Sequence, residues 1–77
     1  MKLTEKSMEV LDFVRAHEGR ALISEIAAGV GRTTKSVNAN VNDLVKKALA
    51  SRVKEEGAEE ATCVLTDEGA AFEPSED

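Results

Sequence analysis

The chain has 77 residues, with 15 acidic and 10 basic side chains, a formal net charge of −5 and an apolar content of 42%. A chain of this length folds around one hydrophobic core, because two halves would each be too small to bury a core of their own. Its single cysteine and single histidine exclude an internal disulfide and a four-ligand zinc site. No apolar run is long and uncharged enough for a signal peptide or a membrane span, so we expect a cytoplasmic protein.

The charges are unevenly distributed along the chain. Residues 1–31 hold four bases and five acids, residues 32–54 hold six bases and one acid, and residues 55–77 hold nine acids and no base. The stretch GRTTKSVNANVNDLVKK, residues 31–47, gathers four of these bases and three asparagines around Asp43. An anionic partner would therefore meet a local basic patch, whatever the sign of the net charge.

Two helices are predicted in the first part of the chain. Thr4 is suited to cap a helix over about residues 4–18, and Gly19 is suited to end it. A short extended link then leads into a second helix of about two turns, around residues 23–30, whose apolar residues recur at helical spacing.

The third predicted helix covers about residues 33–49, with Thr33 or Thr34 as its cap. Its apolar positions fall on one face, so that face is expected to be buried. The opposite face carries Lys35, Ser36, Ala39, Asn42, Asp43 and Lys46, with Asn38 and Asn40 on its two flanks. The residues expected in the core include Leu11, Val14, Ile26, Val37, Val41, Leu44 and Leu65.

After the third helix the apolar period changes from that of a helix to that of a strand. Residues 51–55 alternate polar and apolar side chains, residues 56–59 form a turn pattern, and residues 61–66 are rich in β-branched side chains. This pattern predicts a β-hairpin. A last helical turn capped by Thr66 follows, and residues 74–77 are expected to be an acidic disordered tail.

The order of these elements, together with two motifs, resembles the DNA-binding domain of MarR-type regulators. The run EIAAGVGRTTKSVNANVNDLVKKALASR is similar to the helix-turn-helix of that family, and LTDEG, residues 65–69, is similar to the motif that follows its wing. The resemblance covers most of residues 4–70. It implies an α+β winged helix-turn-helix in one domain over residues 1–73, with a three-helix core and a two- or three-stranded antiparallel β wing.

The sequence departs from the family pattern in three ways. Ala48 stands where the family usually has glycine, so a left-handed end of the third helix is not expected from it. The wing lacks the basic residue that the family commonly carries there. The helices that form the dimer in full MarR proteins have no counterpart here, so we expect a monomer or a weak homodimer.

In a helix-turn-helix the second helix of the motif enters the major groove of double-stranded DNA, which the resemblance makes the expected partner. Asparagine can pair with adenine, lysine with guanine or phosphate, and serine or threonine with either base edges or phosphate. The alternative interpretation is that these polar side chains are merely solvated. The residues expected to contact DNA are Arg32, Thr33, Thr34, Lys35, Ser36, Asn38, Ala39, Asn40, Asn42, Arg52 and Lys54.

The acids of the predicted wing favour a second hypothesis. Glu55, Glu56, Glu59 and Glu60 would repel a phosphate backbone, so the wing is not expected to enter the minor groove. A winged-helix protein-interaction module could instead use this acidic wing and the tail to bind a basic protein partner. The sequence shows no paired-carboxylate, nucleophile–base or phosphate-loop pattern. We therefore predict a transcriptional regulator that is not an enzyme and holds no cofactor or metal.

Overall fold

The computed structural model describes residues 3–73. Along the chain these residues form α1 (Glu5–Ala16), β1 (Arg20–Leu22), α2 (Ile23–Val30), α3 (Thr34–Lys46), β2 (Ala50–Val53), β3 (Thr62–Leu65) and α4 (Asp67–Ala70). This order confirms the predicted α+β winged helix-turn-helix. The acidic tail predicted over residues 74–77 lies outside the described residues.

α1 begins directly after its predicted cap, Thr4, and ends before the predicted C-terminus. Thr4 Oγ1 accepts a hydrogen bond from the backbone N–H of Ser7 at 3.2 Å, which satisfies one of the free donors of the first turn. The chain leaves the helix at His17, because Glu18 and Gly19 both have positive φ angles, 63° and 80°. The predicted C-terminus at residue 18 is therefore two residues too late.

α3 is also shorter than predicted. Thr33 is its N-cap and accepts a hydrogen bond from the N–H of Ser36 at 3.2 Å. The helix ends at Lys46, because Ala48 adopts a left-handed conformation with φ of 62° and the N–H of Leu49 turns back to the carbonyl of Leu44 at 2.9 Å. Ala48 thus makes the left-handed turn that the family resemblance associates with glycine, although an alanine at this position gave no ground to assume it.

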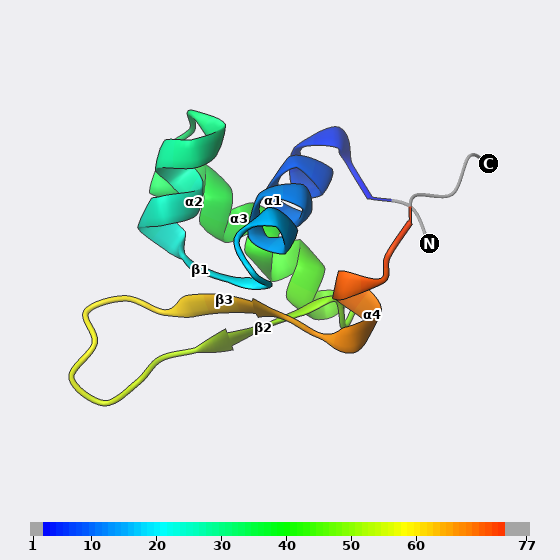
Figure 1. Cartoon of the computed structure of the whole chain (residues 1–77). Helices are drawn as coiled ribbons and strands as arrows, with labels where there is room; N and C mark the ends of the chain where they lie inside the picture. The colour runs from blue at the N-terminus through cyan, green and yellow to red at the C-terminus, as the bar shows by residue number, and fades with distance from the viewer. Residues whose placement is uncertain (1–2, 74–77) are drawn as a thin grey trace.

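The three strands form one antiparallel sheet in the order β1-β3-β2. The last strand in the chain is therefore the central one, with Cys63 of β3 opposite Ala21 of β1 on one side and Arg52 of β2 on the other. In Figure 1 the helices lie on one side of this sheet, and the β2–β3 loop, the wing, extends away from them. α4 lies at the opposite end of the sheet from the wing loop.

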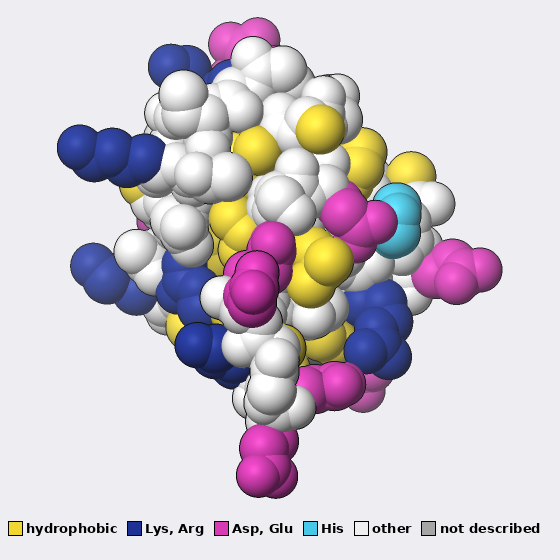
Figure 2. All heavy atoms as spheres, turned by 90° about the vertical axis from the view of Figure 1, so that its left-hand side faces the viewer, with side chains coloured by type: hydrophobic (Ala, Val, Ile, Leu, Met, Phe, Trp, Pro, Cys, Tyr) yellow, Lys and Arg dark blue, Asp and Glu magenta, His cyan; other side chains and the backbone are white. Residues whose placement is uncertain are grey.

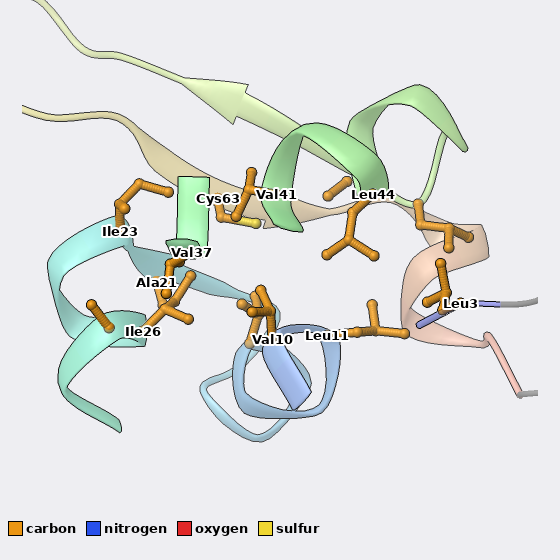
Figure 3. Packing of buried hydrophobic residues seen from close by; sticks show 14 residues of the cluster. Leu3, Val10, Leu11, Ala21, Ile23, Ile26, Val37, Val41, Leu44 and Cys63 are labelled. Atoms are coloured by element: carbon orange, nitrogen blue, oxygen red, sulfur yellow. The ribbon is translucent and has the colours of Figure 1, made fainter. Parts of the chain in front are cut away.

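The hydrophobic core fills the space between the helices and β3, and it consists almost entirely of aliphatic side chains (Figure 3). Leu11, Val14, Ile26, Val37, Val41 and Leu44 are all 0% exposed, as the sequence predicted. Leu65 is the exception, because it is only partly buried and packs against the edge of the core. Val10 and Cys63, which are also fully buried, complete the centre of the core.

The LTDEG segment, residues 65–69, joins the end of α3 to α4 through hydrogen bonds and close packing. Thr66 Oγ1 accepts from the N–H of Gly69 at 3.1 Å and donates to the carbonyl of Ala48 at 2.7 Å. Gly69 packs so closely that a Cβ atom there would lie 1.8 Å from the carbonyl oxygen of Leu49. Arg15 then donates from α1 to the carbonyl of Phe72 at 2.6 Å. The motif therefore has a structural role.

Candidate nucleic-acid interface

α3 turns one face into the core and leaves the opposite face in solvent. The exposed face carries Lys35, Ala39, Asn42 and Lys46, which are spaced at three or four residues along the helix. Within residues 3–73 the ammonium groups of Lys35 and Lys46 make no ion pair. This face can therefore offer positive charge and hydrogen-bond donors to an anionic partner.

Asp43 is the single acid of the basic segment, and it does not share this exposed face. Its carboxylate is partly buried toward α1, where Oδ2 accepts from Ser7 Oγ at 3.2 Å and pairs with Lys47 Nζ at 3.0 Å. Our placement of Asp43 among the solvent-facing residues is thus wrong. The side chain of Ser7, which is 1% exposed, needs this acceptor because an unpaired buried hydroxyl is costly.

Arg52 reaches from β2 onto the sheet-side flank of α3. Its Nη1 donates to Asn42 Oδ1, and its Nη2 donates to the carbonyl and to Oδ1 of Asn38 at 3.0 and 3.1 Å. The guanidinium therefore joins the sheet to the helix. Lys54, expected beside it, follows the end of β2 and is exposed.

Arg32 lies on the other flank of α3, toward α1. Its Nη1 donates to Asn40 Oδ1 at 2.7 Å, and its Nη2 donates to the carbonyl of Lys6 at 3.0 Å and lies 3.4 Å from the Glu9 carboxylate. The Arg32 side chain is only 15% exposed. Arg32, which the sequence analysis expected to contact DNA, is therefore tied into the helix packing.

The first turn of α3 presents small hydroxyl side chains to solvent. Thr33 Oγ1 donates to Ser36 Oγ at 3.2 Å in addition to capping the helix, and both residues are exposed. Thr34 is also exposed and lines a hollow of about 280 Å³ together with Asn38 of α3 and Glu60 of the wing.

Of the four acids of the wing, Glu60 is bonded to α2 and the other three are exposed to solvent. The two carboxylate oxygens of Glu60 accept from the N–H and the Oγ of Ser24, at 2.9 and 3.1 Å, in the first turn of α2. A carboxylate at a helix N-terminus is favourable because it meets unpaired N–H groups there. Glu55, Glu56 and Glu59 are exposed. Figure 2 shows the molecule from the side of the wing loop. Acidic side chains lie in the middle and at the lower end of the face that it shows, with Lys and Arg side chains to either side.

The remaining candidate groups form no further site. Cys63 is fully buried, and burial raises the pKa of its thiol to about 11, with Arg52 acting in the opposite direction. Within residues 3–73, no cluster of three His, Cys, Asp or Glu side chains is arranged to hold a metal. In the same part of the chain, no helix has the length and apolarity that crossing a membrane requires.

No family model and no curated protein matches the sequence. Solved structures, however, match the fold closely. YusO from Bacillus subtilis superposes with a TM-score of 0.81 at 27% identity, over 90% of this chain and 49% of its own. The PcaV transcriptional regulator from Streptomyces coelicolor gives 0.81 at 22% identity, over 91% and 50%. A mutant MarR from E. coli in complex with operator DNA gives 0.78 at 20%, over 90% and 49%.

The chain has a winged helix-turn-helix fold that is similar to that of MarR-type regulators. It spans about half the length of the solved chains that it matches. Within the MarR-like fold, α2 and α3 form the helix-turn-helix, and β2 and β3 with their loop form the wing.

The sequence pattern placed Lys35, Ala39, Asn42 and Lys46 on the exposed face of α3, but it did not predict the contacts that hold the side chains around them. The bonds from Arg52 to α3 and from Glu60 to Ser24 join residues 10 to 36 positions apart. The clustering of arginine and asparagine near α3 is the only signal in the sequence that could have suggested the first contact. No local signal points to the second.

Proposed function

We propose that this chain binds double-stranded DNA as the reading domain of a cytoplasmic transcription regulator, with α3 in the major groove. The observation that carries this proposal is the exposed face of α3, where Lys35, Ala39, Asn42 and Lys46 lie together and Asp43, the one acid of α3, is turned toward α1 and paired. The superposition on a MarR in complex with operator DNA supports the same assignment. The function is therefore binding, without a catalytic step.

The proposed contacts to DNA fall into groups according to the chemistry of each side chain. Thr33, Thr34 and Ser36 begin the helix and offer hydroxyls to phosphates or base edges, while Lys35 offers a charge to phosphate. Arg52 keeps unused N–H groups beyond its bonds to α3, since a guanidinium has five donors. The full set of proposed DNA-contacting residues is Arg32, Thr33, Thr34, Lys35, Ser36, Asn38, Ala39, Asn40, Asn42, Arg52 and Lys54.

Arg32 and the wing limit the strength of this binding. The Arg32 guanidinium would have to release Asn40 or the Lys6 carbonyl before it could turn to a phosphate. The wing tip carries acids and no base, so it stays out of the minor groove. We count about three phosphate contacts, from Lys35, Arg52 and Lys54, which predicts a slope of log K against log salt of about −3.

A fluorescence-anisotropy titration of mixed-sequence duplex DNA at two salt concentrations tests the proposal. Lys35→Ala is expected to weaken binding to all sequences and to reduce the salt slope by about 1. Arg20→Ala removes the same charge from β1, at the edge of the sheet opposite β2, and serves as the matched control. Absence of binding at low salt, with the helices intact by circular dichroism, would overturn the proposal.

The acidic wing favours the second candidate function, a protein-interaction module. Glu55, Glu56 and Glu59 are exposed next to one another at the wing and would attract a basic protein segment. Failure of the DNA titration would make this function the better one. For either function we propose a monomer or weak homodimer, and a tight dimer in sedimentation experiments would contradict that part.

A further inference from the structure

The three asparagines of α3 all turn their amide oxygens toward arginine side chains. Arg52 donates to Oδ1 of Asn42 and of Asn38, and Arg32 donates to Oδ1 of Asn40. A guanidinium carries only hydrogen-bond donors, so the amide atom that faces it must be the oxygen and cannot be the nitrogen. The orientation of each amide therefore follows from the chemistry of its partner.

This orientation decides what each amide can offer to DNA. Asn38 and Asn42 are exposed, whereas Asn40 is partly buried. With Oδ1 held by Arg52, the group that these two side chains leave for a partner is the Nδ2 amide, which is a donor. A free asparagine pairs with adenine by donating to N7 and accepting from the N6 amino group. That pairing also needs Oδ1. An amide oxygen has a second lone pair, but an adenine N6 amino group that used it would stand next to the donors of Arg52.

Guanine presents two acceptors, N7 and O6, at its major-groove edge, and so it suits a surface of donors. The neighbouring Lys35 and Lys46 are also donors only. We infer that Asn42 and Asn38 select guanine over adenine because Arg52 fixes them as donors. This inference rests on the proposed function and names the base edge that the same surface reads.

Arg52 is then a positioning residue. It is held from three directions: β2 places it opposite Cys63 of the central strand, Asn42 accepts from its Nη1, and both the backbone and the side chain of Asn38 accept from its Nη2. A side chain anchored in this way loses little further freedom when DNA binds, so it can impose one orientation on its partners.

The test selects binding sites from a pool of random duplexes, using the full chain and its Arg52 variants. The wild type is expected to enrich a guanine whose replacement by 7-deazaguanine, which lacks the N7 acceptor, weakens binding about three- to tenfold in anisotropy. Asn42→Ala is expected to be insensitive to that replacement. Arg52→Lys, which still offers only donors, keeps guanine, whereas Arg52→Gln, which can donate or accept, admits adenine at the same position.

The outcomes separate this inference from the proposed function. Enrichment of adenine at the position that depends on Asn42, or no change of preference in a folded Arg52→Gln variant, overturns the inference and leaves DNA binding intact. Binding without any base preference also overturns it. No binding to any duplex overturns the proposed function, and the inference with it. If Arg52→Gln does not fold, exchange of that guanine for adenine, which keeps N7 but presents an amino donor in place of O6, still decides when wild type and Asn42→Ala are compared.

Discussion

Ala48 closes α3 in a left-handed conformation, with φ of 62°. This conformation costs an L-residue about 1–2 kcal/mol, whereas glycine adopts it freely and loses about 0.5–1 kcal/mol through greater freedom in the unfolded chain. We therefore expect Ala48→Gly to raise the free energy of unfolding by about 0.5–1 kcal/mol in chemical denaturation. Ala39→Gly, in the exposed middle of α3, is the control and is expected to lower it by about 1 kcal/mol. A loss of stability in Ala48→Gly would contradict the strain argument.

Cys63 makes stability depend on pH in the alkaline range. Burial raises the pKa of its thiol from 9.0 to about 11, so the unfolded chain loses the thiol proton at a lower pH than the folded chain does. The stabilisation is complete below about pH 9 and is lost as the pH rises through about 11, for a total of about 2–3 kcal/mol. Denaturation of wild type and of Cys63→Ala across this range measures the difference. Parallel pH profiles would rule out the thiol as the cause.

At the scale of elements, α4 depends on one glycine. A Cβ at residue 69 would lie 1.8 Å from the carbonyl oxygen of Leu49 and 2.9 Å from its carbon, and this is backbone that cannot swing aside. Gly69→Ala is expected to cost about 1–3 kcal/mol of unfolding free energy, because α4 must move away from the end of α3. Gly29→Ala meets only the ring of Phe13, so it is expected to cost less in the same thermal denaturation series. Equal losses in the two variants would refute this explanation.

Element types and helix starts could be predicted from the sequence because their causes are local. Thr4, Thr33 and Thr66 cap helices through contacts three residues away. Helix ends were less predictable: the apolar period of α3 continues through Ala48 and Leu49, although the chain has already turned. The bonds that position the candidate site could not be predicted, since Arg52 and Asn38 are 14 positions apart and belong to different elements, β2 and α3.

For the whole molecule, the balance between the basic and acidic surfaces sets the expected affinity. Glu60 lies at the base of the wing, bound to the first turn of α2 and close to Thr34 and Asn38 of the helix that we propose to bind DNA. Glu60→Gln removes one negative charge, so we expect DNA affinity to rise about two- to threefold at low salt and less at high salt. Glu68→Gln, in α4 at the other end of the sheet, is the matched control (Figure 1). The same gain from both variants would show that only net charge matters.

The position of β3 in the sheet also bears on how the chain is made. Among the strands of residues 3–73, β3 is the last to leave the ribosome, yet β1 and β2 each pair only with it. Until Thr62–Leu65 emerges, neither earlier strand has a partner, while the three helices can already pack against one another. Leu22 must then find Thr62 across the segment that contains α2, α3 and β2, and bringing the ends of so long a segment together carries an entropic cost. We expect the sheet to form in a single late step, and that step to limit the rate at which a nascent chain folds.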